Sequence, residues 1–493
     1  MASSNERTNI LLILTDQHRY DTLGCYGAQT CRTPNIDGIA DRGVRFDRTY
    51  TPTSPCSPAR AALFTGLYPH KNHVDVNDRI LNPNVPTLAS ELGKAGYNLG
   101  YAGKWHVDRN KVPTDYGFEG RNFPGYGYPP GGGVIQRLRF GDWQRKPIPH
   151  YPEYLERHGY EKPRVLDAFY GDNPGKQNQE MYALQSGTIE TTFECMVSEF
   201  AIELLRQFKE SRDQEGKPFF IWANFWGPHT PCLIPEPYYS MYDPKAIPEE
   251  PSFTETWDRK PRVQELYERF WGLSSGGWKS WREIVARYWG YVTMIDDLVG
   301  RILEELKTLC LEENTLVVFT TDHGDMMGAH RLIEKGPFTY EQCYRLPMVA
   351  AHPACESPGS VSDEFVYLHD LFPTALEVAG VEPPDVPDSR SILDNMMGRA
   401  VPTDRDSIYS AFFSQIFPFE QRMTRTRTHK LVYNVSDIGE LYDMVNDPWE
   451  MRNLIDLPET QSIQNELLDR MREHMERLRD PILRRFDGMR HVY

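Results

Sequence analysis

Short apolar runs that alternate with longer helical patterns constrain this chain more than any other feature of its sequence. The runs predict strands at residues 9–15, 97–102, 218–225, 315–321 and 346–351. The stretches between them predict helices at residues 87–95, 191–209, 281–309 and 371–379. Strands that alternate with helices are typical of βαβ units. We therefore expect an α/β fold with a mostly parallel central sheet flanked by helices.

Two long insertions and a Pro-rich stretch interrupt this alternation. Residues 123–177 are rich in Pro, Gly and Tyr, and residues 243–277 are rich in Pro, Glu and Trp, so both are expected to be surface excursions. After the Pro-rich stretch, short strands are predicted at 407–413, 423–426 and 429–434, and a helix at 461–478. We expect a larger domain over residues 1–380 and a smaller α+β subdomain over 381–493, with a small antiparallel sheet and a closing helix.

The charge balance and the cysteines exclude several classes of protein. The chain has 493 residues, with 54 Lys and Arg against 70 Asp and Glu, a formal charge of −16. Nucleic acids and anionic membranes bind net basic faces, so we expect neither partner. No run is long and apolar enough for a membrane span or a signal-peptide core, and the eight cysteines form no CxxC pair. We expect a reduced, cytoplasmic setting, although a chain whose leader has been removed would look the same.

Four of the predicted strands end in dense polar clusters, and two of these clusters offer metal ligands. One strand runs into Asp16 and Gln17, and another runs into Asp322 and His323. Sites in open α/β sheets form at the carboxyl ends of the strands. Oxygen ligands with one imidazole suit a hard divalent cation such as Ca²⁺, Mg²⁺ or Mn²⁺ better than structural zinc. The alternative is that Asp16 and Asp322 merely cap the turns that follow their strands.

The other two clusters supply a cation and proton-transfer groups. Lys104 and His106 are two residues apart, so on an extended segment they face the same way, as an anion site would need. His229 lies between two prolines in a stiff turn, which favours a fixed imidazole that acts as a general acid. The alternatives are a surface lysine with a buried structural histidine for the first pair, and a structural loop histidine for the second cluster.

The segment around Cys56 is the most distinctive local feature. It reads Cys-Ser-Pro-Ala-Arg over residues 56–60 and leads from a loop into a predicted helix. A cysteine at a helix N-terminus, with Arg60 one turn further on, has a depressed pKa and an adjacent anion site. The other seven cysteines are expected to be small buried hydrophobes.

The order of these motifs resembles the type I sulfatases of the alkaline phosphatase superfamily. Residues 56–60 match the C-x-P-x-R signature, which continues into Leu-Phe-Thr-Gly at 63–66. Upstream, the match includes Asp16, Gly-Cys-Tyr-Gly at 24–27 and Thr-Pro-Asn-Ile-Asp at 33–37. Downstream, it includes Gly-Lys-Trp-His at 103–106, Pro-His-Thr-Pro at 228–231, Thr-Asp-His-Gly at 321–324, Lys335, Asp-Leu-Phe-Pro-Thr at 370–374 and Glu-Leu-Tyr-Asp at 440–443. The resemblance therefore covers nearly the whole chain.

The resemblance implies an alkaline-phosphatase-like fold and a modified nucleophile. In this family a maturation enzyme oxidises the motif cysteine to formylglycine, so Cys56 would become an aldehyde that hydrates to a gem-diol. A hydroxyl of that diol ionises more easily at a divalent cation and would attack sulfur, and the resulting hemiacetal sulfate would collapse to release sulfate. By position, the metal, most simply Ca²⁺, would be held by Asp16, Gln17, Cys56, Asp322 and His323.

The family positions also imply roles for the remaining residues. Arg60 would orient the diol, and Lys104 and Lys335 would neutralise the sulfate oxygens as point charges. His106 would take the proton of the second hydroxyl during sulfate release. His229 would protonate the leaving oxygen.

One departure from the family pattern keeps a second activity open. Many sulfatases have two consecutive aspartates after the first strand, whereas this chain has Asp16-Gln17, as related phosphonate monoester hydrolases tend to have. Those enzymes generally lack the Gly-Lys-Trp-His element, so Lys104 and His106 favour a sulfuric ester hydrolase, arylsulfatase-like or acting on carbohydrates, over a phosphonate monoester or phosphodiester hydrolase. Two further alternatives are an inactive binder of sulfated glycans and a thiol hydrolase that uses unmodified Cys56.

The sequence specifies the substrate less well than the site. The sequence does not define which small-molecule or saccharide sulfate ester is bound. Aromatic residues in or beside the insertions are candidates to stack on it, although such side chains more often pack in a core. These residues are Tyr126, Tyr128, Trp143, Trp271, Trp278 and Trp281. Arg19, His330 and Arg331 lie beside motif residues and are candidates to bind a substrate carboxylate. The terminal segment 483–493 is a candidate contact for a homo-oligomer.

Overall fold

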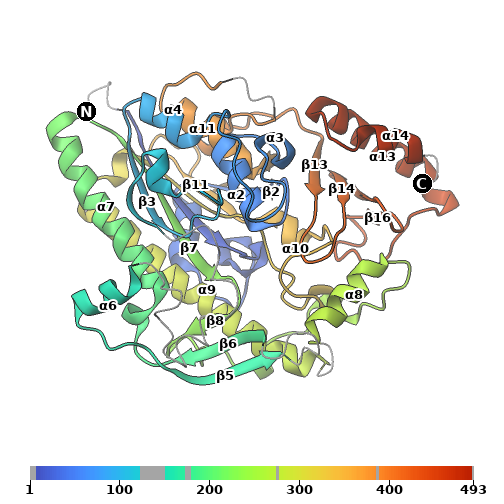
Figure 1. The fold of residues 1–493 in the computed structure, drawn as a ribbon, viewed down its shortest axis with the longest axis horizontal. Coiled ribbons are helices and arrows are strands. Elements are labelled where there is room, and N and C mark those ends of the chain that lie inside the picture. The colour runs from blue at the N-terminus through green and yellow to red at the C-terminus, as the bar shows by residue number, and fades with distance from the viewer. Residues whose placement is uncertain (1–6, 123–149, 172–178, 274–276, 385–387, 491–493) are drawn as a thin grey trace.

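A nine-stranded sheet runs through the middle of the protein (Figure 1). The structure, a computed structural model, describes residues 7–122, 150–171, 179–273, 277–384 and 388–490. The strand order is β10-β2-β11-β9-β1-β7-β3-β4, with β12 on the other side of β2. The strands are β1 (Asn9–Asp16), β2 (Val44–Tyr50), β3 (Asn98–Gly103), β4 (Glu119–Asn122), β7 (Phe219–Pro228), β9 (Thr315–Thr321), β10 (Arg345–Leu346), β11 (Met348–Ala351) and β12 (Ser360–Tyr367).

The sheet is mostly parallel, which confirms the predicted fold class. Strands β9, β1, β7, β3 and β4 run in one direction, whereas β10 and β11 pair antiparallel to β2. All of β1, β7 and β9 is buried, as the near-continuous apolar runs predict for central parallel strands. The predicted strand 346–351 is divided in two, because Pro347 has no backbone N–H to continue the ladder.

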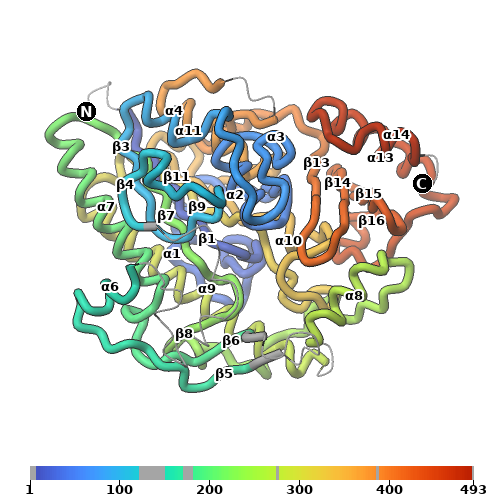
Figure 2. The backbone as a smooth tube through the Cα atoms, viewed as in Figure 1, coloured from blue at the N-terminus to red at the C-terminus, as the bar shows by residue number. Residues whose placement is uncertain are grey.

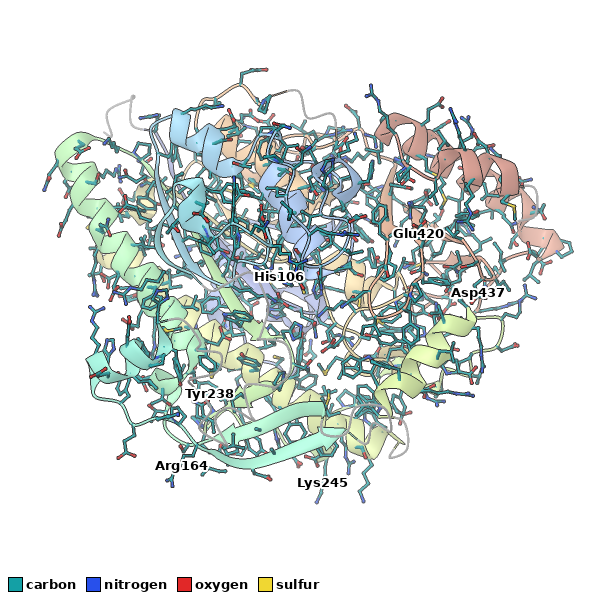
Figure 3. The ribbon with its side chains drawn as sticks, in the orientation of Figure 1. His106, Arg164, Tyr238, Lys245, Glu420 and Asp437 are labelled. Carbon is teal, nitrogen blue, oxygen red and sulfur yellow. The ribbon has the colours of Figure 1, made fainter. Side chains whose placement is uncertain are left out.

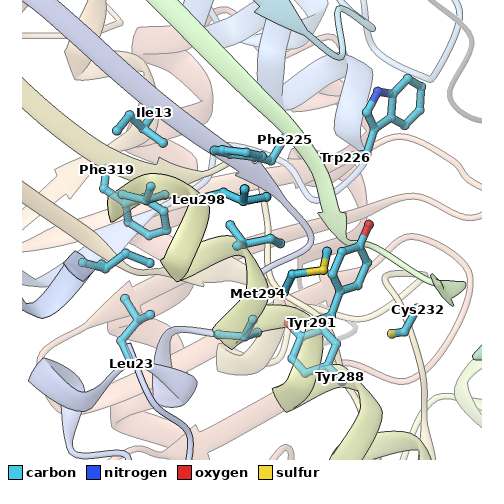
Figure 4. Close-up of a cluster of buried hydrophobic side chains, with 14 of the residues drawn as sticks. Ile13, Leu23, Phe225, Trp226, Cys232, Tyr288, Tyr291, Met294, Leu298 and Phe319 are labelled. Atoms are coloured by element: carbon cyan, nitrogen blue, oxygen red, sulfur yellow. The ribbon is translucent and has the colours of Figure 1, made fainter. Parts of the chain in front are cut away.

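Helices cover both faces of the sheet, so the side chains of each central strand alternate between two cores. Leu11 and Ile13 of β1 join the larger core, and Leu12 and Leu14 join the smaller one. Figure 4 shows Ile13 and Phe319 on the face of the sheet that packs against Leu298 and other residues of α9 (Gly277–Thr308). The larger core is covered by α1 (Pro34–Arg42), α7 (Phe193–Glu215) and α9 (Gly277–Thr308), and the smaller one by α2 (Cys56–Thr65), α4 (Leu88–Lys94) and α11 (Leu371–Val378).

A second, antiparallel sheet near the C-terminus packs beside the first (Figure 2). It contains β13 (Ser407–Phe412), β14 (Gln421–Thr426), β15 (His429–Asn434) and β16 (Glu440–Asp443) and is covered by α13 (Gln461–Leu478) and α14 (Leu483–Met489). The amide of Ala411 donates to the carbonyl of Pro52 (2.9 Å), so this sheet supports the segment that leads to Cys56. The antiparallel sheet and the closing helix agree with the sequence, and the division at residue 381 stays a prediction.

The two insertions contain helices and a strand that the sequence did not predict. The first includes α6 (Tyr151–His158) and β5 (Val165–Gly171), which forms a three-stranded sheet with β6 (Gln179–Gln185) and β8 (Cys232–Ile234); Tyr126, Tyr128 and Trp143 lie outside the described residues. The second lies at the surface as expected but contains α8 (Arg262–Trp271), which buries Val263, Tyr267 and Trp271 along one face. Trp281 of α9 is also fully buried, so its aromatic ring serves packing.

The cysteines are all unpaired, in agreement with the sequence. The prediction that the other seven cysteines are buried was wrong in part, because Cys310 is exposed and Cys25 and Cys355 are half-buried. These three cysteines lie in surface turns outside the strands that fill the core. Short helices complete the fold at α3 (Pro69–Asn72), α10 (Glu341–Tyr344) and α12 (Leu393–Met396). Within the described ranges, no helix has the length and apolar character that crossing a bilayer requires.

Candidate active site

The polar residues at the carboxyl ends of β1, β3, β7 and β9 meet at the N-terminus of α2. Cys56 is the first residue of this helix and is 2% exposed, so its thiol lies inside the protein. Figure 3 shows His106, just beyond β3, toward the middle of the molecule. The convergence follows from the topology, because β3, β7, β1 and β9 are consecutive parallel neighbours whose ends share one edge.

Four side chains at this edge form a buried group with the composition of a metal site. One donor atom each from Asp16, Cys56, Asp322 and His323 lies within 4.8 Å of the other three. The Cys56 Sγ atom is 3.0 Å from His323 Nε2 and 3.8 Å from Asp16 Oδ1. Two buried carboxylates this close favour a cation between them, so the donor set fits a divalent metal ion with mostly oxygen ligands.

Arg60, one turn into α2, braces the two carboxylates. Its Nε atom donates to Asp322 Oδ2 (2.7 Å) and its Nη2 atom donates to Asp16 Oδ2 (3.0 Å). The remaining Nη1 atom donates to Asn224 Oδ1 (3.1 Å) and to the carbonyl of Lys104 (3.2 Å), and the whole side chain is buried. Arg60 therefore fixes the positions of Asp16 and Asp322 relative to the residue 56 side chain.

Gln17 lies beside this group, with its amide orientation fixed from both ends. Its Nε2 atom donates to Asp325 Oδ2 (2.5 Å), and its Oε1 atom accepts from Lys335 Nζ (2.6 Å). Asp325 in turn accepts from the backbone amides of Met327 and Glu334. Because Asp325 selects the orientation, the amide oxygen of Gln17 faces the cationic side of the site. The role of Gln17 as a metal ligand stays a prediction.

Two buried lysines give the site a positive potential. Lys104 Nζ donates to Asp16 Oδ2 (2.5 Å) and lies 5.1 Å from the centre of the Trp226 ring, and Lys335 Nζ lies 2.8 Å from His229 Nε2. Burial opposes ionisation of Cys56, yet the charges of Lys335 and Lys104 hold the pKa of its thiol well below the usual range. The site thus stabilises negative charge at residue 56.

The imidazole groups are oriented by neighbouring acceptors. His106 Nε2 is 3.3 Å from Asp78 Oδ1, and both residues adopt the left-handed backbone conformation, at φ 49° and 63°. His229 Nδ1 is 2.6 Å from the carbonyl of Thr230, which leaves Nε2 directed at Lys335. Each histidine is therefore held by one ring nitrogen while the other faces the site.

A buried carboxylate holds the end of β7 from behind. Glu194, in the first turn of α7, accepts from the amides of Trp226 (3.1 Å) and Gly227 (3.0 Å) and from the hydroxyl of Tyr291 (2.6 Å). Burial raises the pKa of Glu194 to about 7 in spite of these hydrogen bonds. The turn that carries His229 therefore depends on a group outside the predicted motifs.

The structure brings every predicted site residue into one cluster: Asp16, Gln17, Cys56, Arg60, Lys104, His106, His229, Asp322, His323 and Lys335. Four contributing residues were missed: Asp78, Glu194, Asn224 and Asp325. Asn224 and Asp325 had a signal, since one is polar within an apolar strand and the other ends a predicted cluster. Asp78 and Glu194 had none, because a loop aspartate and a glutamate in a helical first turn are common.

The three basic side chains that were candidates to bind a substrate carboxylate are engaged elsewhere. Arg19 pairs with Asp21 and Glu250, and His330 is 2.8 Å from Glu255. Arg331 pairs with Glu268. Carboxylates balance both arginines, and burial lowers the pKa of His330 to about 4, so the three side chains do not form a free anion site.

Comparison with known proteins identifies the family. A family model described as Sulfatase matches residues 8–381, most of the chain, and a model described as N-sulphoglucosamine sulphohydrolase, C-terminal, matches residues 328–477. The chain belongs to the sulfatase family, and the resemblance found in the sequence is confirmed. The family implies a divalent-metal site, in agreement with the four-residue donor group.

Individual relatives are similar along almost their whole length. An uncharacterized sulfatase, YidJ of Escherichia coli (strain K12), is 29% identical over 488 residues, which cover 97% of this chain and 88% of that protein. An N-acetylglucosamine-6-O-sulfatase of Bacteroides thetaiotaomicron is 28% identical over 503 residues, 96% of this chain and 87% of its own. The solved phosphonate monoester hydrolase SpPMH of Silicibacter pomeroyi shares the fold, with a TM-score of 0.76 and 23% identity over 97% of each chain.

Proposed function

We propose that this chain hydrolyses a sulfate monoester with a formylglycine made from Cys56, at a divalent-metal site. The observation that carries the proposal is the position of Cys56. Its thiol is buried at the start of α2, within 4.8 Å of donor atoms on two carboxylates and an imidazole. The charges of Lys335 and Lys104 lower the pKa of this thiol. A buried cysteine of the packing type would have apolar neighbours instead, as Cys232 has in the larger core.

The metal ligands in this proposal are Asp16, Gln17, Asp322, His323 and residue 56. When bound, a divalent cation supplies Lewis-acid chemistry: it lowers the pKa of a coordinated hydroxyl and neutralises negative charge on the ester. Ca²⁺ is our first choice because carboxylate and amide oxygens dominate the donor set, with Mn²⁺ and Mg²⁺ as alternatives. Elemental analysis of the purified protein tests the choice directly.

The protein's own side chains divide the remaining work. Lys104 and Lys335 bind the sulfate oxygens as they gain negative charge, while Arg60 keeps the two carboxylates in position. His229 and Lys335 together supply the proton for the leaving oxygen: His229 Nδ1 donates to the Thr230 carbonyl, and Nε2 accepts from Lys335 Nζ (2.8 Å), so the ammonium and the imidazole form one proton-donating pair. Nε2 of His106 is held by Asp78, which leaves Nδ1 as the ring nitrogen that accepts a proton from residue 56.

The substrate class in this proposal is a sulfated saccharide or another sulfate monoester. The support is the name of one relative, an N-acetylglucosamine-6-O-sulfatase, together with the sulfatase family itself. The second candidate is a phosphonate monoester or phosphodiester, which Gln17 favours because related phosphonate monoester hydrolases tend to have Asp-Gln at this position. The presence of both Lys104 and His106 leads us to rank it second.

A substrate panel separates these candidates. Protein co-expressed with a formylglycine-generating enzyme would be assayed with aryl, choline and monosaccharide sulfates and with a phosphonate monoester, before and after treatment with a chelator. We expect the sulfates to be hydrolysed best and the chelator to abolish turnover. Hydrolysis of the phosphonate alone would overturn the proposal. Loss of activity on thiol alkylation would instead indicate a hydrolase that uses the unmodified cysteine, because an aldehyde resists that reagent.

A further inference from the structure

A separate cavity lies where the turn after β1, residues 247–251 and α9 meet. Its volume is about 180 Å³. Drug-sized ligands occupy pockets of roughly 300–1,000 Å³, so this cavity suits a single head group instead of a whole molecule of that size. Six side chains on its wall give it a distinct chemistry: Asp21, Glu249, Glu250, Trp278, Trp289 and Trp449.

The wall of the cavity is net negative. Along the described wall, Arg19 is the one residue with a permanent positive charge and three residues are carboxylates, so the formal charge is −2. Arg19 is also fully used, because it donates to Asp21 (2.5 and 2.8 Å), to Glu250 (3.1 Å) and to the carbonyl of Met326 (2.8 Å). The cavity therefore repels a sulfate or carboxylate and attracts a cation.

Three tryptophans from two distant segments supply the rest of the wall. Trp278 is fixed by a hydrogen bond from its Nε1 atom to the carbonyl of Ile247 (3.5 Å) and by edge contact with the Phe253 ring (5.1 Å). Trp289 lies further along α9 and makes an edge contact with the Tyr242 ring (5.8 Å). Trp449 comes from the turn after β16 and is 37% exposed, unusual for so large an apolar ring.

We propose that this cavity binds a small alkylammonium group, such as the trimethylammonium group of choline. Indole rings attract organic cations through their electron-rich faces, and the carboxylates add a favourable field. A metal ion would need closely spaced oxygen ligands, whereas three tryptophans lie among this wall's carboxylates. The binding goes beyond sulfate ester hydrolysis and does not depend on it.

The test compares two ligands of the same shape by isothermal titration calorimetry. Choline and 3,3-dimethylbutan-1-ol differ in that the quaternary nitrogen of the first is a carbon in the second. We expect choline to bind at least about tenfold more tightly, since a desolvated cation–π contact is worth that much or more. Equal affinity for the two ligands, or no binding of choline, would overturn the proposal.

Variants locate the site. Glu249→Gln changes an exposed side chain and Trp449→Leu removes one aromatic wall, and each should weaken choline binding several-fold; should Trp449→Leu fail to fold, as judged by circular dichroism, Glu249→Gln decides alone. His229→Ala, in the catalytic cluster, should leave choline binding unchanged. Choline binding that survives Glu249→Gln and is lost in His229→Ala would assign the cation to the catalytic site and refute the proposal.

Discussion

Two clusters of buried charge in this protein have similar composition and opposite consequences. In the catalytic cluster, Arg60 and Lys104 contact Asp16 around the residue 56 side chain. In a second cluster, which we call the junction cluster, Lys430 and Arg425 of the C-terminal sheet pair with Glu341, and Lys430 also pairs with Glu450. Both clusters are almost inaccessible to solvent.

The difference lies in what the charges surround. The junction cluster balances two cations with two carboxylates and adds protein hydrogen bonds, such as Tyr50 to Glu341 (2.7 Å) and the Glu341 amide to Glu450 (2.9 Å). It joins the two sheets, and these side chains act as fixed ion-pair partners. The catalytic cluster instead converges on one reactive side chain and a metal donor set. Buried charge therefore stabilises the fold in one place and prepares chemistry in the other.

The largest expected effect separates the reactive cysteine from the others. Cys56→Ala should lower kcat by about 10⁴-fold or more, because it removes the nucleophile. Cys310→Ala, at an exposed cysteine outside the catalytic cluster, is the matched control and should keep full activity. Steady-state kinetics on a sulfate ester measure both. Substantial activity in Cys56→Ala would show that the cluster does not serve residue 56.

His229→Ala tests the proton donor through the leaving group. The loss in kcat/KM should be about 10²–10⁴-fold for an alkyl or sugar sulfate, whose alkoxide needs a proton. It should be much smaller for 4-nitrophenyl sulfate, whose leaving group departs without help. A series of aryl sulfates gives the dependence on leaving-group pKa. An equal loss across the series would contradict a general-acid role.

Exchanging one lysine in each cluster tests the comparison itself. Lys430→Met should lower the free energy of unfolding by about 3–5 kcal/mol, because it leaves the buried Glu450 carboxylate without its cationic partner. The kcat of the folded fraction should not change. Lys104→Met should lower kcat/KM by about 10²–10³-fold with a smaller loss of stability, because Asp16 keeps Arg60 as a partner.

Urea denaturation and kinetics on the same samples measure both quantities. Similar stability and activity profiles for the two variants would remove the distinction between the clusters.

The smallest expected effect concerns Glu194 and pH. Its pKa is about 7 in the folded protein against an ordinary value of 4.5, so between these values the folded state binds more protons than the unfolded chain. Stability therefore falls as pH rises from 4.5 to 7, by about 3 kcal/mol from this residue. Glu194→Gln should lack that part of the slope in urea denaturation, whereas Glu199→Gln on the same helix should retain it. Parallel stability curves for wild type and Glu194→Gln would refute the shift.

Much of the catalytic cluster was predictable because strands determine it. The bounds of β9 and β15 match the sequence prediction, and β1 is extended by one residue. Polar residues directly after such strands must share an edge, so Asp16, Lys104 and Asp322 were found from local pattern alone.

The junction cluster left no such trace, since Glu341, Lys430 and Glu450 come from a short helix, a strand and a turn with no shared period. The same holds for Glu194 and Asp78. The packing of α8 was also missed, because Pro-rich flanks hid its apolar face. Long-range pairing of single residues depends on the assembled fold, which a local pattern does not encode.

The mass of the tryptic peptide that spans residues 49–60 tests the central claim most directly. It would be measured in an active sample, with turnover recorded on the same preparation. We predict that Cys56 is replaced by formylglycine and that specific activity rises in proportion to the converted fraction. An active preparation in which this peptide carries only unmodified cysteine would contradict the claim.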